Sequence, residues 1–249
     1  MSGEAGLARR AAVEAVGTAG LVLVVVGSGI QASRLTGDVA LQLLAVSTAT
    51  VLGLAVLIAV LGPISGAHLN PVVTLVAWSQ RHARPGNRLR EPAAYVALQI
   101  AGAAAGAVLA NAMFGLPLVE LSTHTRTGGP LWLGEVVATA GLIVVVFGLA
   151  RTGRERWAAP AVAAYIGAAY WFTSSTSFAN PAVTIGRALS DTFAGIAPAS
   201  VPGFVAAQLV GALAGAALLV ALFGRPLPRP GDVVLPHPSP DSLQRIPER

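Results

Sequence analysis

Six long runs of apolar residues dominate this chain of 249 residues. A helix needs roughly 20 apolar residues to cross the hydrocarbon core of a bilayer, whereas barrel strands are about half as long and alternate in polarity. The runs cover Ala11–Ile30, Val39–Leu61, Ala93–Phe114, Leu131–Ala150, Trp157–Thr173 and Val201–Phe223. The fifth run is the shortest, and its ends are the hardest to place. The sequence therefore predicts an all-α, multi-pass membrane protein.

The charged residues narrow the possible functions. Only 11% of the residues are charged, against about a quarter in soluble domains, and all sixteen basic residues are arginines. Because these arginines lie between the apolar runs, they favour membrane anchoring over nucleic-acid binding. The absence of cysteine excludes disulfides and thiolate metal sites. No catalytic or metal-binding constellation stands out, so we expect neither an enzyme nor a bound cofactor or metal.

The arginines also predict an orientation. If the six runs alternate across the membrane, thirteen arginines fall on one side and only Arg34, Arg126 and Arg187 on the other. The positive-inside rule then places both termini in the cytoplasm. We expect the protein to lie in the plasma membrane. Residues 1–10 form a short cytoplasmic N-terminus in this prediction. The proline-rich tail, 224–249, is predicted to be a disordered cytoplasmic segment.

An internal repeat divides the chain. Residues 95–118 align without gaps to residues 204–227, with fourteen of twenty-four positions identical. Each half, 11–114 and 131–223, contains three of the predicted helices, and residues 115–130 connect them. Because three is an odd number, the second half enters the membrane from the opposite face, which predicts an inverted repeat.

Each half also carries an Asn-Pro pair, Asn70-Pro71 and Asn180-Pro181, followed by about nine apolar residues. Asparagine is a preferred helix N-cap and proline is favoured at the first helical position. One pair alone is typical of an ordinary cap, but two pairs in register with a repeat predict opposed half-helices that meet near the midplane. Their electropositive ends would repel cations there. We expect Asn70 and Asn180 to cap these helices and to offer their amide donors to a pore.

The twin Asn-Pro motifs, the run Gly66–Pro71 and the doubled three-helix unit resemble the aquaporin, or major intrinsic protein, family over residues 10–224. The resemblance implies six spanning helices, two re-entrant half-helices and passive conduction of small uncharged solutes. It also implies a homotetramer with one pore in each subunit.

The selectivity filter departs from the family pattern. An arginine usually follows the second motif directly, but this chain has Val183 there, and Arg187 lies four residues further on. Spacing from the motifs places the remaining filter positions at Thr50, Ala168 and Ser177. This predicted filter is small, neutral and without arginine, so we expect solutes larger than water to pass.

The identity of the solute stays open at this point. The run 180–185, leading into 191–196, resembles aquaporin-like channels encoded with bacterial arsenic-resistance functions, which implies conduction of arsenite besides glycerol or water. Arsenite is uncharged near neutral pH and is compatible with a neutral filter. A water-selective channel is one alternative. A secondary transporter, which also uses inverted repeats and broken helices, is another.

Three further side chains are expected to support the pore. Glu14 and Glu135 lie within the first helix of each half, and the resemblance implies that they accept hydrogen bonds from the re-entrant loops. His68 is predicted to pack and bond within the first loop rather than to bind a metal or sense pH. Two GxxxG pairs predict close helix crossings, at Gly102/Gly106 and Gly211/Gly215.

Overall fold

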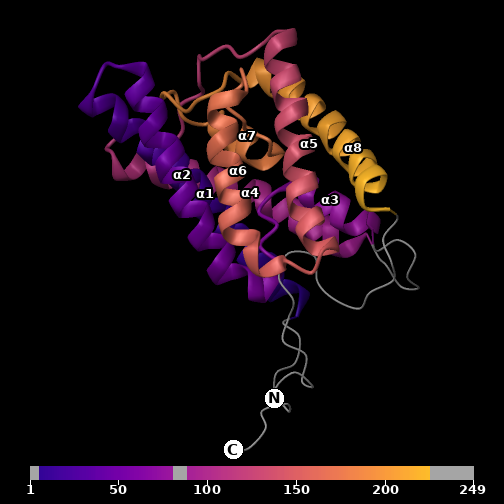
Figure 1. The fold of residues 1–249 in the computed structure, drawn as a ribbon. Helices are drawn as coiled ribbons and strands as arrows, with labels where there is room; N and C mark the ends of the chain where they lie inside the picture. The colour runs from indigo at the N-terminus through magenta and orange to yellow at the C-terminus, as the bar shows by residue number, and fades with distance from the viewer. Residues whose placement is uncertain (1–5, 81–88, 225–249) are drawn as a thin grey trace, which may run out of the picture.

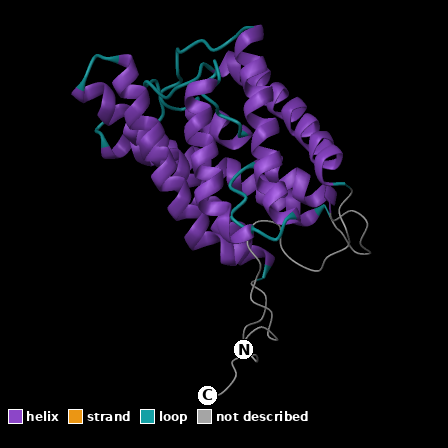
Figure 2. Ribbon diagram, in the orientation of Figure 1, coloured by secondary structure: helices purple, strands orange, loops and turns teal. Residues whose placement is uncertain are grey.

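The computed structural model describes residues 6–80 and 89–224, and this part of the chain contains helices and loops without a strand (Figures 1 and 2). The predicted disordered tail lies outside the described residues from 225 onward. Residues 1–5 of the predicted N-terminal segment and the arginines Arg81, Arg84 and Arg88 also lie outside them.

Five helices of the described part are long and apolar enough to cross a membrane. They are α1 (Leu7–Leu35), α2 (Val39–Ser65), α4 (Arg90–Met113), α5 (Gly129–Arg151) and α8 (Val201–Phe223). The sixth crossing is α6 (Ala158–Phe172), which follows the short turn η1 (Glu155–Trp157) and runs lengthwise beside α5 (Figure 1). Its 15 residues span about 22 Å, less than the roughly 30 Å of a hydrocarbon core. This length explains why the fifth apolar run was the weakest signal.

Two short helices complete the fold. The half-helices α3 (Pro71–Gln80) and α7 (Pro181–Arg187) lie toward opposite ends of the bundle, α3 low and α7 high in Figure 1, and they contact each other. This arrangement confirms the predicted pair of opposed re-entrant helices. With seven residues, α7 is shorter than the nine that we expected. It ends early because the N–H groups of Ala188 and Leu189 bond carbonyls only three residues back, which tightens the last turn.

Glycines allow the closest helix crossings. α1 packs against α4, and α5 packs against α8. A Cβ atom at Gly211 on α8 would lie 2.6 Å from the carbonyl oxygen of Val136 on α5, and one at Gly102 on α4 would overlap the carbonyl of Ala15 on α1. The predicted role of the GxxxG pairs is confirmed. A short turn, η2 (Pro198–Ser200), leads into α8.

These crossings give a first testable prediction. A Gly102→Leu substitution forces α1 and α4 apart, and overpacking of this kind costs about 1–3 kcal/mol or more. We expect the thermal midpoint of the purified protein in detergent to fall by on the order of 10 °C. Ala105→Leu, on the exposed side of the same helix, is the matched control and should leave the midpoint unchanged. Equal midpoints for the two variants would contradict the tight crossing.

Candidate functional site

Two loops with an unusual backbone lead into the half-helices. Before α3, Ala67 and Leu69 have φ angles of 44° and 49°, and before α7, Ser177 and Ala179 have φ angles of 50° and 47°. Each residue of the second pair follows its counterpart in the first pair by the same number of positions, so the internal repeat extends to the backbone conformation. A non-glycine residue in this left-handed region costs on the order of 1–3 kcal/mol. Such backbone persists only where its surroundings hold it in place.

Glu14 holds the first loop. Its carboxylate, which is 0% exposed, accepts hydrogen bonds from the backbone N–H groups of His68 at 3.0 Å and Leu69 at 2.6 Å. It also accepts from the hydroxyl of Ser65 at 2.7 Å and from the side-chain amide of Gln99 at 2.8 Å. One carboxylate on α1 thereby fixes the strained segment and its neighbours.

Glu135 does the same for the second loop. This carboxylate on α5 is also 0% exposed and accepts from the N–H groups of Phe178 at 2.8 Å and Ala179 at 2.9 Å. The amide of Gln208 on α8 donates to it at 2.6 Å. The contacts of both glutamates are those that the family resemblance implied.

The two asparagines cap the half-helices. The Oδ1 atom of Asn180 accepts from the N–H groups of Ala182 at 3.0 Å and Val183 at 3.2 Å. The Oδ1 atom of Asn70 accepts from the N–H of Val72 at 3.1 Å. Each helix therefore begins at the proline that follows its asparagine, with its N-terminal end at the middle of the bundle.

The asparagine amides also link the two halves. Asn70 Nδ2 donates to the carbonyl of Ala179 at 2.8 Å, and Asn180 Nδ2 donates to the carbonyl of Leu69 at 2.7 Å. We expected both N–H groups of each amide to be available to the pore. This expectation was wrong, because one N–H group of each asparagine is bonded to a carbonyl of the other half. A side-chain amide has two N–H groups, so one of them remains at each asparagine for a passing solute.

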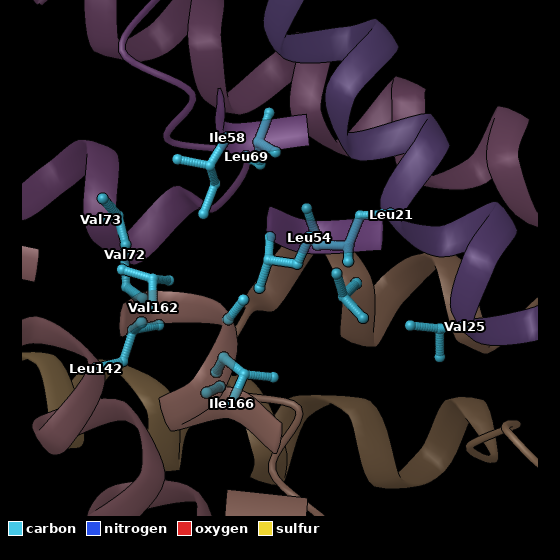
Figure 3. Packing of buried hydrophobic residues seen from close by; sticks show 14 of the residues in the cluster. Leu21, Val25, Leu54, Ile58, Leu69, Val72, Val73, Leu142, Val162 and Ile166 are labelled. Carbon is cyan, nitrogen blue, oxygen red and sulfur yellow. The ribbon is translucent and has the colours of Figure 1, made fainter. Parts of the chain in front are cut away.

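A cavity runs past these asparagines through the centre of the bundle. It is lined mainly by apolar side chains from both halves. Figure 3 shows several of them gathered from α1, α2, α3, α5 and α6. Its apolar wall includes Leu21, Val25, Leu54, Ile58, Leu69, Val73, Leu142, Val146, Val162 and Ile166. The asparagine amides are therefore polar groups beside a largely apolar wall.

Three of the four predicted filter residues line this cavity, namely Thr50, Ser177 and Val183. The placement of Ala168 was wrong, because this residue lies on an exposed face of α6 and Tyr170 lines the cavity instead. Adjacent residues of a helix are about 100° apart, so Ile166 and Tyr170 share a face that Ala168 cannot reach. Counting back from the motif without gaps therefore missed the pore-lining face of α6.

Polar groups in this part of the cavity come from Thr50, Tyr170 and Ser177. The hydroxyl groups of Thr50 and Tyr170 hydrogen-bond each other at 3.2 Å, which joins α2 to α6. The hydroxyl of Ser177 is buried without a hydrogen-bond partner among the described residues.

Arg187 also lines the cavity, a contact on which the sequence spacing made no prediction. Its side chain is 3% exposed and its guanidinium lies 3.5 Å from the ring centroid of Phe178. Its Nε–H donates to the carbonyl of Ala194. Arg187 is one helical turn beyond Val183. The position directly after the second motif is occupied by Val183 and not by an arginine.

His68 lies near the other end of the cavity. Its Nδ1 atom is 3.1 Å from the hydroxyl of Thr74, and its ring packs edge-on against Tyr95 with centroids 5.4 Å apart. Phe178 and Phe204 form the equivalent pair in the second half, with centroids 5.1 Å apart. The packing and bonding predicted for His68 are present. We call its end of the cavity the His68 mouth and the opposite end the Arg187 mouth.

The loop between the halves is fastened beside the Arg187 mouth. Asp191 accepts hydrogen bonds from the N–H of Thr123 at 2.9 Å and from its hydroxyl at 3.1 Å, and it lies 3.4 Å from His124. The bond from the Thr123 backbone is the main reason that the pKa of this carboxyl lies below its usual range. Within the described residues, no group of three potential ligands could hold a metal ion.

Some lining residues were missed by the sequence analysis. Leu21 and Val25 on α1 correspond to Leu142 and Val146 on α5 at the spacing that separates Glu14 from Glu135. Extending the repeat from the loops to the first helix of each half would have found all four. Arg187 and Tyr170 carried no such signal, since neither has an equivalent in the first half.

Comparison with known proteins extends these observations. A family model described as "Major intrinsic protein" matches residues 2–178. Aquaglyceroporin AqpS of Rhizobium meliloti (strain 1021) is 49% identical over 238 residues, which are 95% of this chain and 97% of that protein. Probable aquaporin AqpM of Archaeoglobus fulgidus is 33% identical and covers 69% of this chain and 73% of its own length.

A solved structure has the same fold. The X-ray structure of the aquaglyceroporin from Plasmodium falciparum superposes with a TM-score of 0.61, covering 88% of this chain and 96% of that chain at 19% identity. The match spans both halves, so the half-helices and the surrounding helices share one architecture.

Proposed function

Since this chain belongs to the major intrinsic protein family, whose members are membrane channels and not enzymes, we propose that it conducts neutral solutes larger than water. The solutes that we assign to it are glycerol-like polyols and uncharged metalloid acids such as arsenite, with water passing as well. Conduction is passive and in either direction, down the gradient of the solute.

The observation that carries this proposal is Val183. It lies in the first turn of α7, next to the cap of Asn180, and lines the cavity with a side chain that is short and apolar. A short side chain leaves room where an arginine would narrow the passage. The apolar wall suits carbon-bearing solutes, and the side-chain amides of Asn70 and Asn180 donate hydrogen bonds to their hydroxyl oxygens. The first relative named above is itself an aquaglyceroporin.

The half-helices supply the barrier to ions in this proposal. Both N-terminal ends meet at the asparagines, and each carries the equivalent of about half a positive charge. A cation at that point meets two electropositive ends and an apolar wall that cannot replace its hydration shell. A neutral solute meets neither penalty.

A water-selective channel is the second candidate, and Tyr170 and Arg187 favour it. An aromatic ring and a guanidinium both line the cavity, and large side chains of these types narrow a passage. The two candidates differ in whether glycerol passes the purified protein in vesicles.

Substitution of Val183 tests the proposal. A Val183→Arg variant places a second guanidinium beside Asn180, and we expect glycerol and arsenite flux into proteoliposomes to fall at least about tenfold, equivalent to roughly 1.4 kcal/mol. Water flux, measured by stopped-flow light scattering, should fall much less because water is smaller. Val183→Leu, which adds volume without charge, is the control and should have an intermediate effect on glycerol.

The outcomes separate the two candidates. Glycerol flux through the wild-type chain with the loss in Val183→Arg supports the wide channel. Water flux without glycerol flux in the wild-type chain supports the water-selective one. Equal selectivity of wild type and Val183→Arg would mean that Val183 does not limit the passage.

We also propose that the chain resides in the plasma membrane as a homotetramer with both ends in the cytoplasm. The arginine distribution supports the orientation, and exposed apolar side chains on the outer helices, such as Leu52, Val56 and Leu213, suit contact with lipid or with neighbouring subunits. Protease accessibility of the C-terminal tail in sealed vesicles tests the orientation, and mass measurement in detergent tests the assembly.

A further inference from the structure

The side chain of Arg187 reaches the cavity although the residue lies beyond the position at which an arginine usually follows the second motif. It is the last residue of α7 and faces the cavity from one turn beyond Val183. The Cζ atom of its guanidinium lies 3.5 Å from the ring centroid of Phe178, and its Nε–H donates to the carbonyl of Ala194. The side chain is therefore held against the cavity wall by two contacts, one with the Phe178 ring and one with the Ala194 carbonyl. Only 3% of it is exposed.

The Nη donors of this guanidinium have no hydrogen-bond acceptor among the described residues. A guanidinium has five N–H groups, and Nε provides one. Within residues 6–80 and 89–224, no group accepts a hydrogen bond from either Nη atom, and no acidic side chain forms an ion pair with Arg187. Buried donors without a partner are costly. Four N–H groups without a hydrogen-bond acceptor among the described residues thus belong to a side chain that lines the cavity.

A second arginine, Arg126, also contacts the ring of Phe178. The guanidinium of Arg126 lies 5.3 Å from the centroid of Phe178 and donates to the carbonyls of Gly195 at 2.8 Å and Phe193 at 3.3 Å. Arg126 is not among the residues that line the cavity. Phe178 therefore interacts with both cations by cation–π attraction, and of the two only Arg187 lines the cavity.

We propose that Arg187 is a specificity-determining residue at the Arg187 mouth, and this inference rests on the proposed function. Its Nη groups donate to the oxygens of neutral solutes that carry several hydroxyl groups, and its charge repels cations before they reach the asparagines. Phe178 and the Ala194 carbonyl act as positioning groups. They hold the guanidinium at the wall, so the space beside Val183 stays open.

The test uses the purified full chain in sealed vesicles, with stopped-flow measurement of glycerol and water flux and a pH-sensitive dye for proton leak. In Arg187→Met, which keeps most of the volume without the charge, we expect the proton leak to rise on the order of tenfold. In Arg187→Lys, which keeps the charge but loses the fork of donors, the leak should stay low and the glycerol-to-water flux ratio should fall about threefold. Arg34→Met, which removes a guanidinium that contacts Phe114 and does not line the cavity, is the matched control and should change the leak less than about twofold.

Several outcomes would overturn the inference. A wild-type leak in Arg187→Met would do so, and so would an equal rise in Arg34→Met, since that would indicate a general effect of removing an arginine. If Arg187→Met does not assemble, an unchanged flux ratio in Arg187→Lys would be decisive. Absence of glycerol flux in the wild-type chain would instead overturn the proposed function, so the two failures are distinguishable.

Discussion

Replacement of Glu14 by alanine is expected to abolish the folded channel. The carboxylate accepts four hydrogen bonds inside the bundle. Its loss leaves three buried donors unpaired, at about 1–3 kcal/mol each, together with the part-buried N–H of His68. The left-handed residues Ala67 and Leu69 would also lose the contacts that hold them. Because folded proteins are stable by only about 5–15 kcal/mol, the loss is comparable to the whole stability.

Thermal unfolding in detergent and glycerol flux in vesicles measure this effect. We expect the midpoint of Glu14→Ala to fall by more than about 10 °C and its flux to be lost. Glu120→Ala removes a carboxylate from an exposed part of the connecting loop and is the matched control, with wild-type behaviour expected. A Glu14→Ala protein with the wild-type midpoint and flux would show that the loops hold their shape unaided.

An Asn180→Asp variant is expected to convert a neutral-solute channel into a leaky one. Aspartate retains an oxygen that caps Ala182 and Val183, so α7 should still begin at Pro181. However, the donor to the Leu69 carbonyl becomes an acceptor, and a negative charge offsets the electropositive helix ends. We expect glycerol flux to fall about tenfold and the proton leak to rise at least as much.

Asn111 offers a matched comparison for this change. It is also buried, and its amide donates to the carbonyls of Leu118 and Leu189, but it does not line the cavity. Asn111→Asp should therefore lower stability without raising the proton leak. The same leak in both variants would mean that leakage follows from loosened packing rather than from charge at the centre of the passage.

The sequence predicted the parts of the molecule that repeat. The apolar runs indicated the spanning helices, and the paired Asn-Pro motifs indicated the opposed half-helices, because capping chemistry and helix length act locally along the chain. The glutamates were also identified, although their partners followed from the family resemblance and not from spacing. All of these features occur once in each half.

The parts that do not repeat were missed. Ala168 was placed by counting residues, but the choice between Ala168 and Tyr170 depends on how far α6 is rotated about its axis, which packing against α2 and α5 decides. Arg187 was predicted to lie away from the position that an arginine usually occupies. The sequence could not show that its long side chain still lines the cavity, because Phe178 and Ala194 determine its path.

The reciprocal bonds between the asparagine amides and the carbonyls of Leu69 and Ala179 have a consequence for biosynthesis. Neither bond can form until both halves are present, and the second asparagine leaves the ribosome 110 residues after the first. At about 5–20 residues per second, that delay is on the order of ten seconds. During this interval the first loop is already within the translocation machinery or the lipid without its partner, so closure of the centre is a late event of assembly.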